Sequence, residues 1–296
     1  MKKKVVFVVV LILLALFSTN YLFVVGPERV VEEFKKQQSS LNQSQKDDGA
    51  KVFLDNLASY LLYARASDSV YSQDSQRELE EIFPMYDFSI SSYEKGCLKI
   101  AVGFNHKSKK TLVIFRGTVP MCPSNWIANF THGAFGNSKL YENARRFIEA
   151  EVMRQEYSGY SVVFVGHSLG GSLAINNGVY FGNSDVYTFN TAFPNSFGVD
   201  AAQLNKYMKI REKNVARSTV TNFVVEGDEV AGKSLSKFHG LIGNTYMLSH
   251  SDIPARQSLD HSISEVIYKL EVVSQRTPEE INNFGRDSYV GEKMTF

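Results

Sequence analysis

One pentapeptide of this chain, Gly166-His167-Ser168-Leu169-Gly170, has the G-x-S-x-G pattern of a nucleophilic serine. A strand-like run, YSVVFVG, ends at Gly166, the first residue of this pattern, and a helical pattern, LGGSLAINNGVY, comes directly after Ser168. A sharp turn between strand and helix leaves no room for bulky side chains two residues away on either side, which explains the two glycines. We therefore predict that Ser168 is a nucleophile. The amide of Leu169, at the start of the helix, is the expected oxyanion donor.

A serine nucleophile needs a base to take its proton and an acid to orient that base. In α/β-hydrolases the acid and then the histidine follow the serine along the chain. Asp228 follows the apolar run FVVEG, at the carboxyl end of an expected strand, where open α/β sheets place functional groups. Asp185 precedes its strand, and Glu226 lies inside the run. Asp252 and Asp260 lie in polar connections, so Asp228 is the favoured acid.

The base is one of the histidines that follow Asp228, namely His239, His250 and His261. Order along the chain does not choose among them. His261 begins the amphipathic pattern HSISEVIYKLEV, which predicts a final helix over residues 261–272. A junction between loop and helix is a suitable place to present an imidazole over the edge of a sheet.

The elements that must position these residues alternate between strand and helix. Two apolar runs, Leu98–Phe104 and Thr111–Phe115, are separated by the polar turn NHKSKK and predict a hairpin. A helical pattern spans Lys139–Tyr157, and the strand-like runs YSVVFVG, SDVYTFN and TNFVVEG recur behind turn residues. This order indicates an α/β fold with a mostly parallel central sheet flanked by helices.

The length of 296 residues leaves room for one large α/β domain, which we place at residues 51–275. Residues 27–50 are predicted to be a polar tether and residues 276–296 a polar C-terminal tail. The net charge of +1, without basic clusters interleaved with aromatic residues, argues against a nucleic-acid partner. Cys97 and Cys122 are the only cysteines, too few for a disulfide framework or a cysteine-rich metal site, and their spacing leaves open whether they pair.

The N-terminal segment Val5–Val25 carries no charge and follows lysines at positions 2–4. As a helix rising ~1.5 Å per residue it matches the ~30 Å hydrocarbon core of a bilayer. The lysines favour a cytoplasmic N-terminus, so we predict that residues 1–26 are a transmembrane anchor and that the domain lies outside the cytoplasm. No small-x-small cleavage site stands around Ser18–Asn20. A cleaved signal peptide, giving a secreted or periplasmic protein, remains the alternative.

Several motifs in one order resemble those of the class 3 lipase family, which includes secreted fungal triacylglycerol lipases. TLVIFRGT, SNWIANF, THGAF, VGHSLGGSLA and VYTFNTAFPN are similar to that family's F-R-G-T/S strand, N-W-x-x-D segment, V-H-x-G-F segment, nucleophile elbow and v-y-T-F-G-x-P strand. The resemblance covers roughly Leu54 to Leu270 and implies the α/β-hydrolase fold. Asn190 stands where this family commonly has glycine.

The resemblance also implies roles for single residues. It favours His261 as the catalytic base, since family members carry an F-x-H-x-G-like sequence, here around His239, before the catalytic histidine. It makes Thr118 the second oxyanion donor. Asn129 replaces the acidic residue that supports that donor in the family, which weakens the support. Independently of the resemblance, the alternation of side chains along the preceding strand predicts that His167 points away from the nucleophile and is a packing residue.

The stretch from Pro120 to Phe130 matches the position of the family's lid, which opens at a lipid surface. Its apolar side chains suited to lipid are Met121, Trp126, Ile127 and Phe130. The alternative is that these side chains pack in the core.

These observations predict a carboxylic ester hydrolase, that is, a lipase, phospholipase or esterase. Ser168 would attack the ester, His261 would transfer the proton, and Asp228 would orient the imidazole, with no metal or organic cofactor. The membrane segment favours an acyl lipid as substrate. The alternatives are an acyltransferase or thioesterase with the same triad, or a catalytically silent hydrolase fold that binds lipid.

Overall fold

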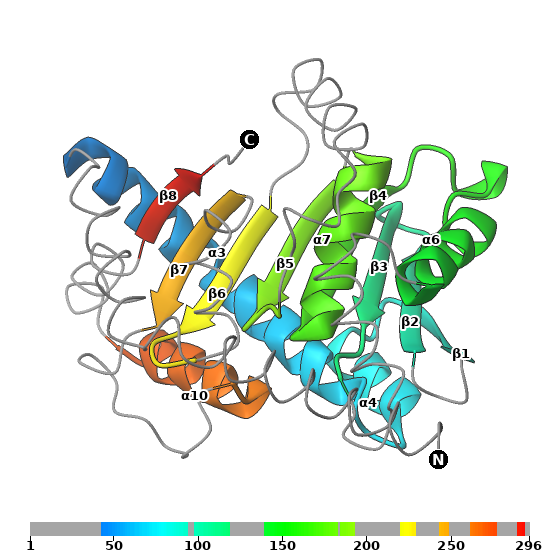
Figure 1. Cartoon of the computed structure of the whole chain (residues 1–296), viewed down its shortest axis with the longest axis horizontal. Coiled ribbons are helices and arrows are strands. Elements are labelled where there is room, and N and C mark those ends of the chain that lie inside the picture. The colour runs from blue at the N-terminus through cyan, green and yellow to red at the C-terminus, as the bar shows by residue number, and fades with distance from the viewer. Residues whose placement is uncertain are drawn as a thin grey trace, which may run out of the picture.

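A single sheet organises the computed structural model, which describes residues 43–93, 98–118, 139–182, 184–192, 220–228, 243–248, 261–276 and 289–293. Within these residues the sheet has eight strands, in the spatial order β1 to β8 (Figure 1). The strands are β1 (Asp87–Tyr93), β2 (Leu98–Asn105), β3 (Lys110–Phe115), β4 (Ser161–His167), β5 (Ser184–Phe189), β6 (Val220–Val225), β7 (Gly243–Leu248) and β8 (Tyr289–Lys293).

The strands from β3 to β7 run parallel to one another, and antiparallel strands flank them on both sides. β2 and β3 form the expected hairpin, with Gly103 opposite Leu112. The predicted α/β fold with a mostly parallel sheet is therefore confirmed. Because parallel strands end at the same edge of a sheet, the segments that follow β3, β4, β5 and β6 come together at one edge.

Helices cover both faces of the sheet. α6 (Lys139–Glu151) and α7 (Leu169–Phe181) pack on one face, and α3 (Gln43–Ser69), α4 (Ser75–Ile82) and α10 (Ile263–Ser274) pack on the other. Figure 1 shows α7 in front of the sheet and α3 behind it. Successive side chains of a strand point to opposite faces, so Val163 and Val165 of β4 join the core under α3, and Val162 and Phe164 join the core under α7. Burial on both faces explains why β4 and β6 are rich in apolar residues along nearly their whole length.

The predicted tether is shorter than residues 27–50, because α3 already begins at Gln43. The backbone carbonyl of Gly49 accepts a hydrogen bond of 3.2 Å from the hydroxyl of Tyr246 on β7, so this part of the helix packs on the domain. The polar composition of residues 43–50 concealed the helix. Its buried apolar residues start at Phe53 and recur at helical spacing through Leu57 and Tyr60.

The prediction of a polar C-terminal tail over residues 276–296 needs a correction, because β8 lies within this range. β8 pairs antiparallel with β7, with Lys293 opposite Gly243. β8 is only five residues long and has polar neighbours, so its sequence gives no clear signal of a strand. Backbone pairing with β7 holds it, and this pairing covers a sheet edge that would otherwise present unpaired amides and carbonyls.

Several predictions concern residues outside the described part of the chain. They are the membrane segment at residues 1–26, the lid residues Met121, Trp126, Ile127 and Phe130, and the pair Cys97 and Cys122. Among the residues that the structure does describe, none belongs to a helix long and apolar enough to cross a bilayer.

Candidate active site

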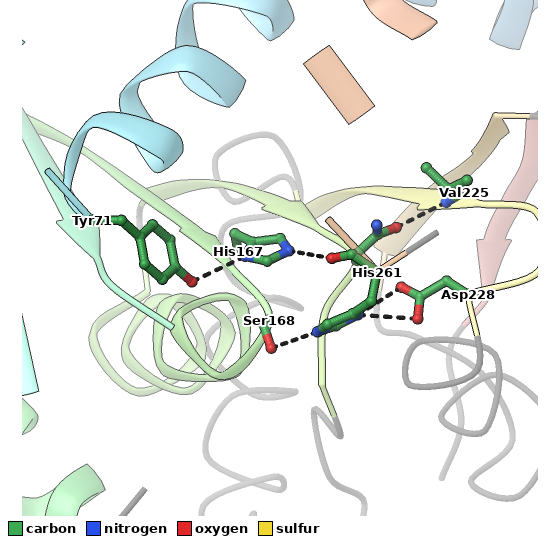
Figure 2. A network of polar contacts seen from close by, with 7 residues as sticks. Tyr71, His167, Ser168, Val225, Asp228 and His261 are labelled. Atoms are coloured by element: carbon green, nitrogen blue, oxygen red, sulfur yellow. Dashed lines mark hydrogen bonds and ion pairs between the residues drawn. The ribbon is translucent and has the colours of Figure 1, made fainter. Parts of the chain in front are cut away.

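Ser168, His261 and Asp228 form a continuous hydrogen-bonded chain (Figure 2). The Oγ of Ser168 lies 2.8 Å from Nε2 of His261, and Nδ1 of His261 lies 2.9 Å from Oδ2 and 3.0 Å from Oδ1 of Asp228. An ionised carboxylate only accepts hydrogen bonds, so Nδ1 of His261 carries a proton. Nε2 is then free to accept the proton of the serine hydroxyl. The three side chains have the connectivity of a nucleophile, a base and an orienting acid.

The exposure of these side chains suits that connectivity. The Asp228 side chain is fully buried, and Ser168 is 6% exposed. The side chain of His261 is 31% exposed, so it stands between the interior and the surface of the domain. A buried carboxylate is shielded from water and therefore acts strongly on the imidazole beside it. A reacting ester can approach from the exposed side of the histidine.

The backbone at Ser168 adopts a conformation that is unusual for any residue other than glycine, with φ 56° and ψ −126°. Surrounding hydrogen bonds hold it there. The Ser168 amide donates to the Phe189 carbonyl at 3.0 Å, and the Ser168 carbonyl accepts from the amides of Ala192 at 3.1 Å and Gly171 at 3.0 Å. Such a strained residue persists because its neighbours fix it, and strain of this kind is concentrated at functional sites.

The two glycines of the motif are required by close backbone contacts. A Cβ atom at position 166 would overlap the carbonyl oxygen of Gly170, and one at position 170 would overlap the carbonyl oxygen of Phe115. The clash in each case is with backbone, which cannot move aside as a flexible side chain can. The spacing G-x-S-x-G thus reflects a turn that packs tightly against the ends of β3 and β4.

His261 is positioned by the start of α10. It lies directly before Ser262, the N-cap residue, whose Oγ accepts a hydrogen bond of 3.2 Å from the Ser264 amide. The helix therefore begins two residues later than the pattern predicted. At the surface, an ion pair of 2.8 Å joins Glu271 of this helix to Arg65 of α3.

Asp228 is positioned by the end of β6. Its amide donates to the carbonyl of Val225 at 3.1 Å, and the amide of Val225 donates to Oδ1 of Asn190 at 2.9 Å. Asn190 follows β5 and has φ 44°, a conformation that glycine and asparagine adopt more readily than other residues. The asparagine at this glycine position thus keeps the required backbone and adds a side-chain link between the ends of β5 and β6.

The predicted oxyanion donors lie on two segments that touch. Leu169 is the first residue of α7, and first-turn amides lack partners within their own helix. Thr118 comes just after β3, next to Gly117, where an added Cβ would lie only 3.1 Å from Cβ of Ser168. The turn after β3 therefore rests against the turn that holds the nucleophile.

The remaining candidates do not join this chain of contacts in the described residues. Asp185 lies near the start of β5, at the edge of the sheet opposite Ser168, as its position in the sequence predicted. His239, His250, Asp252, Asp260 and Asn129 lie outside the described residues. Tyr71, which no motif indicated, makes a hydrogen bond of 3.0 Å with the His167 ring beside the site.

Comparison with known proteins places the chain in a family. Residues 62–237 match a phospholipase-like family model, the Tle-like phospholipase domain. A search of curated proteins gave no match. The solved structures that resemble the chain include lipase II from Rhizopus niveus, with 16% identity and a TM-score of 0.48 over 66% of this chain and 81% of that one.

Two further solved structures are fungal lipases. The triacylglyceride lipase of Rhizomucor miehei shows 17% identity and a TM-score of 0.47, over 70% of this chain and 93% of that one. The mono- and diacylglycerol lipase of Aspergillus oryzae shows 15% identity and a TM-score of 0.41, over 64% and 78%. The lipase-like relationship indicated by the motifs is confirmed by the match to the phospholipase-like family model. Because the match to the family model spans more than half of the 296 residues of this chain, the chain belongs to the Tle-like phospholipase domain family and is a lipid ester hydrolase of the α/β-hydrolase type.

Proposed function

We propose that the chain hydrolyses the acyl esters of phospholipids through an acyl-enzyme formed on Ser168. The observation that carries this proposal is the hydrogen-bonded chain from Ser168 Oγ to His261 Nε2, at 2.8 Å, and from His261 Nδ1 to Asp228. Membership of a phospholipase-like family supports the choice of substrate class.

The geometry supports a two-step acyl transfer. Ser168 Oγ attacks the ester carbonyl carbon while its proton passes to Nε2 of His261, and Asp228 stabilises the imidazolium that forms. The amides of Leu169 and Thr118 donate to the oxyanion of the tetrahedral intermediate. As the intermediate collapses, the proton on Nε2 passes to the leaving alcohol, which is a lysophospholipid. Water, activated by the same nitrogen, then attacks the acyl-enzyme and releases a fatty acid.

A substrate panel tests the proposal and the lid together. We propose that Met121–Phe130 opens at a lipid surface, because its apolar residues Met121, Trp126, Ile127 and Phe130 follow the turn that carries Thr118. Phospholipid vesicles should be hydrolysed to a lysophospholipid and a fatty acid. If half of the ~200 Å² of a tryptophan side chain contacts lipid, ~25 cal/mol per Å² gives about 2.5 kcal/mol, so Trp126→Ser should slow vesicle hydrolysis at least about tenfold.

A soluble short-chain ester is the control for that variant, because its hydrolysis needs no contact with a lipid surface. Equal losses on vesicles and on the soluble ester would make Trp126 a packing residue. Products in which the acyl group is transferred to an added alcohol, with little free fatty acid, would instead indicate an acyltransferase. Turnover of thioesters alone would indicate a thioesterase.

We also propose that Val5–Val25 anchors the domain on the outer side of a cytoplasmic membrane. The supporting features are the absence of charge in this segment and the lysines at positions 2–4. The full chain should stay in the membrane fraction after high-salt and alkaline carbonate washes, because a spanning helix is held by apolar burial. A truncated protein that starts at Pro27 is the control and should be released. A mature N-terminus downstream of Phe17 on a freely soluble protein would establish a cleaved signal peptide instead.

A further inference from the structure

A second series of hydrogen bonds runs through the buried side of the site and has no part in the acyl-transfer steps. The Gly117 amide donates to the Tyr71 hydroxyl at 3.0 Å. That hydroxyl lies 3.0 Å from Nδ1 of His167, and Nε2 of His167 lies 2.7 Å from the backbone carbonyl oxygen of His261. Figure 2 shows Tyr71, His167 and His261 in line, next to the bond from His261 to Ser168.

Each bond in this series has a defined direction. The His261 carbonyl only accepts, so Nε2 of His167 carries a proton. In a neutral imidazole Nδ1 is then an acceptor, and the Tyr71 hydroxyl donates to it. The oxygen of the same hydroxyl accepts from the Gly117 amide. With a neutral His167, the series therefore fixes the Nε2–H tautomer of its ring and needs a protonated Tyr71.

The surroundings stabilise those protonation states. His167 is 7% exposed, and burial, with a further contribution from nearby His261, lowers the pKa of its imidazole to about 3. Burial also raises the pKa of the Tyr71 hydroxyl well above its ordinary value. His167 is thus a neutral hydrogen-bonding residue at physiological pH, although it stands next to the nucleophile in sequence.

The residues joined by this series belong to three parts of the site. Gly117 lies in the turn that carries Thr118, His167 adjoins Ser168, and His261 is the base. At Gly117 an added Cβ would overlap the Tyr71 hydroxyl and lie 2.6 Å from the His167 carbonyl oxygen, so this turn, Tyr71 and the nucleophile turn are in direct contact.

We propose that Tyr71 and His167 are positioning residues that hold the oxyanion turn and the catalytic histidine in fixed register with Ser168. The inference rests on the proposed function, since it assigns these residues to the same reaction. Neither residue belongs to the triad. Both act through the backbone of others: Tyr71 fixes an amide next to Thr118, and His167 fixes the carbonyl of His261.

Tyr71→Phe is the most direct test, because it removes one hydroxyl and keeps the ring. It leaves both the Gly117 amide and Nδ1 of His167 without the partner they have now. Displacements of about 1 Å in a catalytic site cost up to ~10²-fold in rate, so kcat on a soluble ester should fall about 10- to 100-fold while KM changes less than about threefold. Rates are normalised to folded protein, measured by circular dichroism.

Tyr60→Phe is the matched control. Tyr60 lies on α3, is 3% exposed, and belongs to the aromatic core with Phe53 and Phe223, away from the triad. Loss of its hydroxyl should change the melting temperature to a similar extent as Tyr71→Phe but leave kcat within about twofold, since no catalytic group depends on it. A fall in kcat common to both variants, in proportion to stability, would overturn the inference.

Two substitutions at His167 give an independent test that does not depend on how Tyr71→Phe folds. His167→Gln retains an N–H donor that reaches toward the His261 carbonyl, whereas His167→Leu has none. The glutamine variant should therefore keep several-fold more kcat than the leucine variant at equal folded fraction. Equal kcat in the two variants would show that the donor to His261 has no positioning role.

The protonation state of His167 is a spectroscopic readout of the same geometry. In ¹⁵N NMR spectra of the Ser168→Ala protein, His167 should appear as the neutral Nε2–H tautomer and should not titrate between pH 5 and pH 8. A titrating ring, or the Nδ1–H tautomer, would contradict the series. If the wild-type chain itself hydrolyses no ester, the proposed function fails. If it hydrolyses esters and Tyr71→Phe matches its kcat, only the positioning inference fails.

Discussion

Ser168→Ala should lower kcat for ester hydrolysis by about 10⁴- to 10⁶-fold without unfolding the chain, because it removes the atom that forms the acyl-enzyme. The fold should survive, since what is lost is one hydrogen bond from Oγ to His261, worth about 1 kcal/mol. The backbone bonds that hold the turn, from the Ser168 amide to Phe189 and from Ala192 to the Ser168 carbonyl, do not involve the side chain.

Ser172→Ala is the matched control for that prediction. Ser172 lies one turn further along α7, is 2% exposed, and donates its hydroxyl to the Ala192 carbonyl. It therefore loses a buried hydrogen bond as Ser168→Ala does, but without loss of chemistry. A fluorophosphonate should label wild-type protein and Ser172→Ala, but not Ser168→Ala. Near-normal turnover by Ser168→Ala would end the serine-hydrolase mechanism.

The nucleophile turn could be predicted from sequence because its requirements are local. The glycines at positions 166 and 170 and the strand and helix on either side lie within one short stretch, and the backbone contacts of both glycines account for the motif. The acid was also accessible, since Asp228 follows a strongly apolar strand and the edge at which parallel strands end is known in advance. The choice of His261 over His239 and His250 needed the family resemblance, because loops leave no periodic signal.

The residues that sequence reasoning missed depend on contacts between distant segments. Tyr71 meets His167 across 96 positions of the chain, and no pattern within either segment records that contact. α3 is not among the elements predicted from the sequence, although its buried residues Phe53, Leu57 and Tyr60 recur at helical spacing, and the polar residues before Phe53 concealed where the helix starts. β8 is stabilised by pairing with β7, so its five residues alone give no signal of a strand.

His167 shows how a correct local prediction can be incomplete. Alternation along β4 predicts that its side chain points away from the nucleophile, and the structure adds that this side chain makes hydrogen bonds with Tyr71 and with the His261 carbonyl. A packing residue needs only apolar neighbours. His167 has a hydrogen-bond partner on each ring nitrogen, Tyr71 and the His261 carbonyl. These partners belong to segments far apart in the sequence, so a periodic pattern within one strand cannot predict the contacts.

His261→Ala should be nearly as damaging as Ser168→Ala, because the serine hydroxyl then has no base within reach of its proton. The double variant should be little worse than either single one, since the two groups act as a unit and removing one already abolishes the contribution of the other. His106→Ala is the control and should leave kcat unchanged. The His106 side chain is 56% exposed and lies on the β2–β3 hairpin, at the edge of the sheet opposite the triad. Losses that multiply in the double variant would show two independent roles.

Asp228→Asn should lower kcat by about 10³- to 10⁴-fold, which is less than the loss expected from Ser168→Ala or His261→Ala. The loss arises because the substitution changes which ring nitrogen of His261 carries the proton. The carboxylate accepts from Nδ1 at 2.9 Å and so leaves Nε2 unprotonated toward Ser168. An asparagine amide that donates to Nδ1 instead shifts the proton to Nε2, which then cannot accept from the serine.

Asp185→Asn, at the other edge of the sheet, is the control and should retain full activity. The loss should appear in kcat on vesicles and on a soluble ester alike, because the defect is in proton transfer rather than in lipid binding. Full activity of Asp228→Asn, or loss of activity in His239→Ala with His261→Ala active, would assign the base and its acid to other residues.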